Sequence, residues 1–209
     1  MNLIFVHVPK CGGTTIIDTL SNLSKRPLHI WPPENLFSID DKQLFDADFI
    51  ACHATLPAFK KRFGNKIENF KLITNLRNPV DRYISEFHQW VRGGHKITWN
   101  QYMQIESIQN KITQHLFGDP RKSFNENEIC STLNEFYAVF DMADLFTQLP
   151  LFLDQIGASD YKINSANRHG SDQSLTKVEI KSITKMNQSD IQIYKHYHHC
   201  PSGHLAFSN

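Results

Sequence analysis

Residues 7–15 form a turn whose residue types suit the binding of a phosphate group. Their sequence is His-Val-Pro-Lys-Cys-Gly-Gly-Thr-Thr. Glycines let the backbone approach an anion closely, and the amino end of a following helix offers free N–H groups and the positive end of the helix dipole. Because the lysine precedes the glycines, the turn is not the P-loop of ATP-binding proteins, and an ordinary turn with a surface lysine remains the alternative. The expected cradle consists of Lys10, Cys11, Gly12, Gly13, Thr14 and Thr15.

A second segment with phosphate-binding chemistry begins at Arg77. Residues 76–87 are Leu-Arg-Asn-Pro-Val-Asp-Arg-Tyr-Ile-Ser-Glu-Phe, so Ser85 follows Arg77 by eight positions. A guanidinium group between a strand and a helix can bind a phosphate through two parallel hydrogen bonds, and the serine can add a hydroxyl. The alternative is that Arg77 pairs with a carboxylate and that Ser85 is a solvated residue of the helix.

His53 is the candidate general base. It follows the apolar segment Phe-Ile-Ala-Cys at residues 49–52. The pKa of an unperturbed imidazole lies near neutrality, which suits the removal of a proton from a hydroxyl group. The alternative is a buried histidine bonded to the backbone, since the chain has 11 histidines. Four of them crowd into residues 196–204, where we expect a solvated tail rather than a metal site.

The composition is that of a folded domain with little net charge. The chain has 209 residues, of which 40% are hydrophobic and 21% are charged, and its formal net charge is +1. This length favours a single domain over residues 1–209. The small net charge disfavours nucleic acid as a partner, because a protein that neutralises phosphates usually carries a basic surface.

The cysteines and the apolar segments bear on where in the cell the protein is found. The four cysteines are far apart and form no Cys-x-x-Cys pair, so we expect reduced thiols rather than a zinc knuckle or a disulfide framework. The apolar run at residues 3–8 is too short for a signal-peptide core or a membrane span, and no later run is long enough to span a bilayer. These features predict a cytoplasmic protein.

The elements that must position these residues alternate between strands and helices. Apolar runs predict strands at residues 3–8, 49–52, 70–76 and 137–140, with a short edge strand at 161–164. Helical spacing predicts helices at 14–23, after Pro57, from Asn78, within 98–136, at 145–156 and, in two pieces, within 176–197, whereas residues 25–46 are expected to be irregular. This alternation predicts an α/β fold with a mainly parallel sheet flanked by helices, whose ligands bind beyond the carboxyl ends of the strands.

Together the two phosphate-binding segments resemble those of sulfotransferases that use 3′-phosphoadenosine 5′-phosphosulfate (PAPS). Pro-Lys-Cys-Gly-Gly-Thr-Thr at residues 9–15 is similar to the family's 5′-phosphosulfate loop, commonly Pro-Lys-Thr-Gly-Gly/Ser-Thr, so Cys11 is a departure. Arg77 with Ser85 resembles the family's 3′-phosphate motif. Weaker similarities over residues 110–118 and 164–194 extend the match over most of the chain. The most similar branch is the carbohydrate type, which includes heparan and chondroitin sulfotransferases and bacterial relatives.

The resemblance implies a nucleotide-kinase-like fold of the P-loop type and sulfuryl transfer from PAPS to a hydroxyl group, with a carbohydrate or small-molecule acceptor. His53 is then the base and Lys10 the cation at the leaving oxygen, so that no metal is required. Residues near Trp31 and within 89–110 would shape the acceptor site. Two alternatives stay open, namely an ATP-dependent small-molecule kinase and a non-catalytic nucleotide-binding module.

Overall fold

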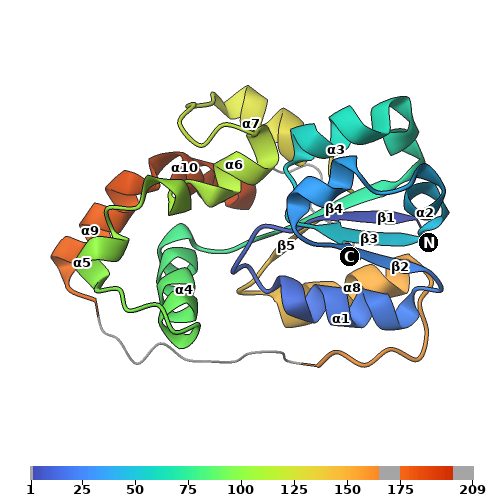
Figure 1. Ribbon diagram of the computed structural model, residues 1–209, viewed down its shortest axis with the longest axis horizontal. Helices are drawn as coiled ribbons and strands as arrows, with labels where there is room; N and C mark the ends of the chain where they lie inside the picture. Colours follow the sequence, from blue (N-terminus) through green and yellow to red (C-terminus); the bar gives the residue numbers. More distant parts are fainter. Residues whose placement is uncertain (1, 165–174, 200–209) are drawn as a thin grey trace.

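The computed structural model describes residues 2–164 and 175–199, and a five-stranded sheet lies at its centre (Figure 1). The strand order is β2-β3-β1-β4-β5, and every neighbouring pair is parallel. The predicted α/β class with a mainly parallel sheet is therefore confirmed. The strands are β1 (Leu3–Val6), β2 (Pro27–Ile30), β3 (Phe49–Cys52), β4 (Lys71–Leu76) and β5 (Ala138–Asp141).

Helices make every connection between the strands, as the alternating sequence pattern predicts. The helix from Asn78 is confirmed, with Asn78 as its cap and Pro79 at its first position. The α-helices are α1 (Gly13–Leu23), α2 (Asp41–Asp46), α3 (Leu56–Phe63), α4 (Pro79–Arg92), α5 (Trp99–Tyr102), α6 (Lys111–Phe117), α7 (Glu126–Leu133), α8 (Leu145–Gln155), α9 (Lys177–Met186) and α10 (Gln188–His199). Short 3-10 helices lie at η1 (Pro33–Phe37), η2 (Gly64–Asn69) and η3 (Glu106–Ile108).

The two faces of the sheet bury separate apolar cores, because successive strand residues point to opposite sides. On one face, Leu3 and Phe5 pack against helices α1 and α8. On the other face, Ile4 and Val6 share a core with α3, α6, α7 and α10. Figure 1 shows α1 and α8 on one side of the sheet and α3 on the opposite side.

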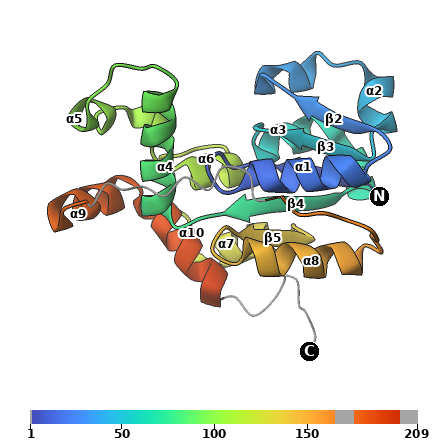
Figure 2. The same ribbon diagram turned by 90° about the horizontal axis from the view of Figure 1, so that it is seen from below.

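Helices α4, α5 and α9 form a third apolar cluster, which projects beyond the carboxyl end of β4. Its buried members include Tyr83 and Phe87 of α4, Tyr102 of α5 and Ile183 of α9. Figures 1 and 2 both show these helices beyond the end of the sheet. The cluster holds α4 in place beside the strand ends, and that helix carries Ser85.

Two sequence predictions about local structure are wrong. Residues 25–46, expected to be irregular, form β2, η1 and α2. Local bonding makes this order possible, because the Asp40 carboxylate caps α2 and the Asp48 carboxylate accepts hydrogen bonds from the backbone N–H groups of Lys25 and Arg26. Residues 161–164, expected to form an edge strand, form none.

The cysteines correct a further expectation. Cys11 and Cys52 are free and buried, but Cys130 is disulfide-bonded, so the expectation of reduced thiols fails at that residue. Within residues 2–164 and 175–199, the helices are all too short or too polar to cross a bilayer.

Candidate functional site

The strand order gathers the three predicted segments at one edge of the sheet. The strand β1 lies between β3 and β4, with β2 beyond β3 and β5 beyond β4. The chain therefore builds the sheet outward in both directions from β1, and in such sheets the carboxyl ends of the strands border a ligand crevice. The segments after β1, β3 and β4 supply Lys10, His53 and Arg77.

The turn after β1 has the backbone conformation of an anion cradle. Lys10 and Gly12 have positive φ angles of 68° and 85°, and α1 begins at Gly13 with no side chain capping its amino end. A left-handed conformation is uncommon for lysine, and such residues cluster at functional sites. The first backbone N–H groups of α1 are therefore free to donate hydrogen bonds to a ligand.

Asn75 holds the turn against the sheet. This buried residue of β4 accepts a hydrogen bond from the backbone N–H of Val8 (3.0 Å) and donates one to the backbone oxygen of Cys11 (2.9 Å). The Cys11 side chain is fully buried in the core, and burial raises its pKa to about 12. Cys11 can therefore meet a ligand only through its backbone.

Gly13 is required because the His7 ring occupies the space where a side chain would lie. A Cβ atom at Gly13 would come within 1.9 Å of His7 Nε2. The His7 ring cannot move aside easily, since it stacks between Phe5 (5.0 Å between centroids) and His53 (4.0 Å). His7 is buried within this stack.

We expect Gly13→Ala to lower the free energy of unfolding by about 1–3 kcal/mol, the usual cost of overpacking a tight site. The matched control is Gly93→Ala at the end of α4, where the new Cβ would lie 3.3 Å from its nearest neighbour, the backbone oxygen of Gln89. Urea titration of both variants measures the difference. Equal losses in the two variants would show that the His7 ring does not restrict position 13.

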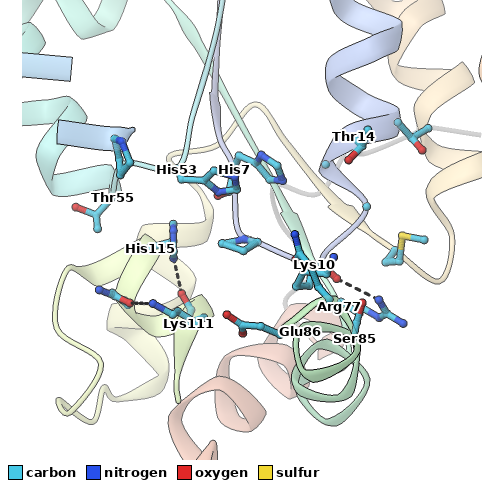
Figure 3. A pocket seen from close by; sticks show the side chains of 18 of the residues that line it. His7, Lys10, Thr14, His53, Thr55, Arg77, Ser85, Glu86, Lys111 and His115 are labelled. Carbon is cyan, nitrogen blue, oxygen red and sulfur yellow. Dashed lines mark hydrogen bonds between the residues drawn. The ribbon is translucent and has the colours of Figure 1, made fainter. Parts of the chain in front are cut away.

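A pocket of about 500 Å³ brings the predicted residues together (Figure 3). Every predicted site residue except Cys11 lines it, namely Lys10, Gly12, Gly13, Thr14, Thr15, His53, Arg77 and Ser85. Arg77 reaches the turn directly, because its Nη1 donates a hydrogen bond to the backbone oxygen of Lys10 (3.1 Å).

His53 is held in one tautomer. Its Nδ1 lies 2.9 Å from the backbone oxygen of His7, and because a carbonyl only accepts, Nδ1 must carry the proton. The Nε2 atom therefore keeps its lone pair and can take a proton. Trp31 and His115 contact the ring edge-on, at 5.4 and 6.5 Å between centroids.

Burial dominates the electrostatics of the nitrogen bases in the pocket. It lowers the pKa of His53, and the nearby charge of Lys111 lowers it further, whereas the bond to the His7 oxygen opposes the shift. Burial also lowers the pKa of His115 to about 3 and lowers the pKa of Lys10. The imidazoles are therefore neutral near pH 7.

One wall of the pocket consists of residues that the sequence did not predict. Lys111, Gln114 and His115 of α6 line it, and so does Glu86, which follows Ser85 on α4. Residues 110–118 drew attention only for their similarity to a family helix, and nothing in their spacing pointed toward the pocket. Glu86 lay within the quoted segment, but only Arg77 and Ser85 had an expected role.

The described part of the chain contains no cluster of three or more histidine, cysteine, aspartate or glutamate side chains arranged to hold a metal. As far as residue 199, the tail at residues 196–204 is helical, because α10 continues through it, and His198 and His199 are exposed, as expected for a solvated segment. His198 Nε2 lies 3.2 Å from the buried Asp141 carboxylate. Residues 200–204 lie outside the described residues.

Comparisons with known proteins identify the family and the fold. The sulfotransferase family model matches residues 1–176. A solved sulfotransferase from Alicyclobacillus acidocaldarius has a TM-score of 0.60 and 14% identity, over 96% of each chain. Mouse SULT7A1, solved in complex with PAP, has a TM-score of 0.50 and 15% identity, over 88% of this chain and 62% of its own.

At such low identity, the two structures bear on the fold alone, and they support the sulfotransferase fold inferred from the sequence. A search among curated protein sequences yields no match. The family model, in contrast, covers most of the chain and includes both segments that the sequence predicts to bind phosphate. The chain belongs to the sulfotransferase family.

Proposed function

We propose that the protein transfers a sulfuryl group from PAPS to a hydroxyl group of an acceptor, with a carbohydrate as the favoured acceptor class. The observation that carries this proposal is the shared pocket, in which an anion-binding turn, a separate arginine–serine pair and a neutral histidine lie together. We also propose that residues 1–209 act as one domain. Mouse SULT7A1, whose structure contains PAP, supports the choice of donor.

The donor is assigned to the side of the pocket formed by the turn and α4. The backbone N–H groups of residues 11–15 and the Lys10 ammonium would bind the 5′-phosphosulfate. Arg77 and Ser85 would bind the 3′-phosphate, which distinguishes PAPS from ordinary adenine nucleotides. Both groups already line the pocket, and the Arg77 side chain touches the turn.

The reaction we propose is a direct in-line displacement. The Nε2 atom of His53 takes the proton of the acceptor hydroxyl while the acceptor oxygen forms a bond to sulfur. The bond from sulfur to the 5′-phosphate breaks, and its electron pair stays on the phosphate oxygen, where Lys10 and the turn amides stabilise the charge. The chain's own cations thus serve the role that a metal has in many phosphoryl transfers.

Trp31 supports a carbohydrate acceptor. Its side chain is 71% exposed, it lines the pocket, and its ring contacts that of His53. A sugar ring can stack on a flat aromatic face, and stacking here would bring its hydroxyl groups close to the proposed base.

The donor assignment is tested by comparing adenosine 3′,5′-bisphosphate with adenosine 5′-monophosphate. We expect the bisphosphate to bind more tightly by about 1.5–3 kcal/mol, the value of one set of charge-assisted hydrogen bonds. Arg77→Ala should remove most of this difference, whereas Arg26→Ala, at the start of the exposed edge strand, should keep it. Calorimetric titration of the three proteins measures the affinities, and equal binding of both nucleotides to the wild type would refute the role of Arg77.

The same titration separates the alternatives. A small-molecule kinase should prefer ATP with magnesium, and a non-catalytic module should bind the bisphosphate without transferring a sulfuryl group from PAPS. The cytoplasmic location stays a prediction, and the disulfide at Cys130 counts against it, because disulfides are rare in reducing compartments.

A further inference from the structure

Lys111 is a partly buried cation in the pocket that forms no close ion pair with a carboxylate of the described residues. Its ammonium donates a hydrogen bond to Gln114 Oε1 (2.8 Å), and no carboxylate among the described residues lies within 4.0 Å of it. Glu86 lines the same pocket but is already engaged, because its Oε2 accepts a hydrogen bond of 2.5 Å from the buried Arg82. A buried charge without a partner is costly, and such groups are concentrated where a ligand supplies the counter-charge.

Lys111 lies on the opposite side of the pocket from Lys10, and Figure 3 shows Glu86 between them. On its own side are the two imidazoles. His115 Nδ1 donates a hydrogen bond to the backbone oxygen of Lys111 (2.7 Å), and the His115 ring contacts His53 edge-on. The charge of Lys111 is close enough to His53 to lower its pKa. Lys111 is therefore near the proposed base, whereas Lys10 is near the donor turn.

The position of Lys111 depends on a carboxylate from the far end of the chain. Helix α6 has no side-chain cap of its own, since Asn110 has a positive φ of 46° and makes no capping bond to the helix. The fully buried Asp190 of α10 takes that role. Its carboxylate accepts hydrogen bonds from the backbone N–H groups of Ile112 (3.0 Å) and Thr113 (2.7 Å) and from the Thr113 hydroxyl (2.7 Å).

A second link fixes the same helix end. Asn187 Oδ1 accepts a hydrogen bond from the backbone N–H of Asn110 (2.9 Å), and Asn110 Oδ1 accepts one from the backbone N–H of Asp190 (3.3 Å). The first residue of α6 is Lys111, so these bonds set where its side chain enters the pocket. A helix end without such bonds would leave its first N–H groups unsatisfied in a buried place.

From this geometry we propose that Lys111 is a second catalytic cation, which contacts the attacking acceptor oxygen, and that Asp190 positions it. This inference rests on the proposed sulfuryl transfer. In an in-line displacement, the attacking and leaving oxygens lie on opposite sides of the sulfur atom. Lys10 faces the leaving oxygen, so the opposite cation, beside His53, faces the attacking one.

Lys111 keeps its proton throughout the step. As His53 removes the proton of the acceptor hydroxyl, negative charge develops on the oxygen, and the ammonium stabilises that charge until the bond to sulfur forms. The ammonium stabilises the charged transition state more than it stabilises the complex with the neutral hydroxyl. Loss of this interaction should therefore lower kcat. The neutral base needs this help, because a buried imidazole is weaker than one in water.

The test compares Lys111→Met, Lys111→Arg and a control, Lys181→Met, which removes an exposed lysine of α9. The acceptors are a panel of simple alcohols, phenols, p-nitrophenyl glycosides and oligosaccharides, with ³⁵S-labelled PAPS as donor. We expect Lys111→Met to lower kcat about 10²-fold, the effect of losing one donor to a developing charge. Binding of adenosine 3′,5′-bisphosphate should stay unchanged. Lys111→Arg should recover part of the rate, and Lys181→Met should match the wild type.

Asp190→Asn tests the positioning role. This variant keeps the size of the side chain and removes its charge, so we expect kcat to fall while the affinity for the bisphosphate stays the same. A purely structural role of Asp190 would instead lower the bisphosphate affinity and the melting temperature together and leave the kcat of the folded fraction unchanged.

The failure of this inference can be told apart from the failure of the proposed function. A wild-type protein that transfers no sulfuryl group to any member of the panel overturns both. A wild-type protein that transfers the group, together with a folded Lys111→Met variant of wild-type kcat, overturns the role of Lys111 alone.

Discussion

Replacement of His53 by alanine should lower the turnover number about 10²–10⁴-fold, the range typical for the loss of a positioned general base. The variant should remain folded and should bind adenosine 3′,5′-bisphosphate with wild-type affinity, since the proposed donor contacts come from other residues. The expectation depends on the hydrogen bond of 2.9 Å from Nδ1 to the His7 oxygen, which leaves Nε2 free to accept a proton. Steady-state kinetics and calorimetric titration of the same preparation test both parts.

The pH dependence adds a second test of His53. The imidazole acts as a base only when it is neutral, so kcat/KM for the acceptor should fall as the pH drops through its pKa. Because burial lowers that pKa from 6.5, the acid limb should lie below pH 6.5. The limb should disappear in His53→Ala. The competing account, a structural histidine, requires a lower melting temperature together with weaker nucleotide binding, and near-native turnover in a folded variant would end the base hypothesis.

Replacement of Lys10 by alanine should lower kcat about 10²–10³-fold and change the affinity for the bisphosphate product much less. Lys10 is expected to contact the oxygen that bridges sulfur and the 5′-phosphate, where charge appears only as the bond breaks, so the contact is worth most in the transition state. Single-turnover measurements with PAPS separate this effect on the chemical step from an effect on binding.

Two results decide the role of Lys10. Lys25→Ala, which removes an exposed lysine just beyond α1, should retain wild-type kinetics and serves as the control for the loss of one positive charge. A Lys10→Ala variant that only raises the KM for PAPS and keeps the wild-type kcat would reduce Lys10 to a binding residue.

Local sequence signals predicted the side of the pocket that carries Lys10, His53 and Arg77, because neighbouring residues determine the backbone structure there. The Gly12–Gly13 turn, the cap at Asn78 and the apolar run at 49–52 each fix a backbone segment from neighbouring residues. Parallel strands with their carboxyl ends together then bring Lys10, His53 and Arg77 to one pocket. That placement follows from the alternation of strands and helices. It can be predicted without knowledge of any contact between distant residues.

The opposite wall could not be predicted, because its position depends on long-range polar contacts. Asp190, 77 residues beyond Thr113, caps the amino end of helix α6 and helps to hold that helix against the pocket. Asp190 has the sequence context of an ordinary helix-start residue, and its burial is a property of the folded chain. The same holds for β2, whose short segment Pro27–Ile30 forms a strand because β3 lies alongside it.

The hydrogen bonds from α10 to α6 also affect the order in which the two sides of the pocket form during synthesis. A nascent chain leaves the ribosome amino end first, and contacts between distant residues form late, because they close long loops. The residues of the turn at Lys10 and of the helix with Ser85 have all emerged once residue 92 has left the ribosome, whereas α9, which packs against that helix, follows later. Helix α6 emerges soon afterwards, but its end stays uncapped until Asp190 follows 77 residues after Thr113. The residues proposed to bind the nucleotide thus emerge first, and the wall that carries Lys111 becomes fixed only when the last described helix docks.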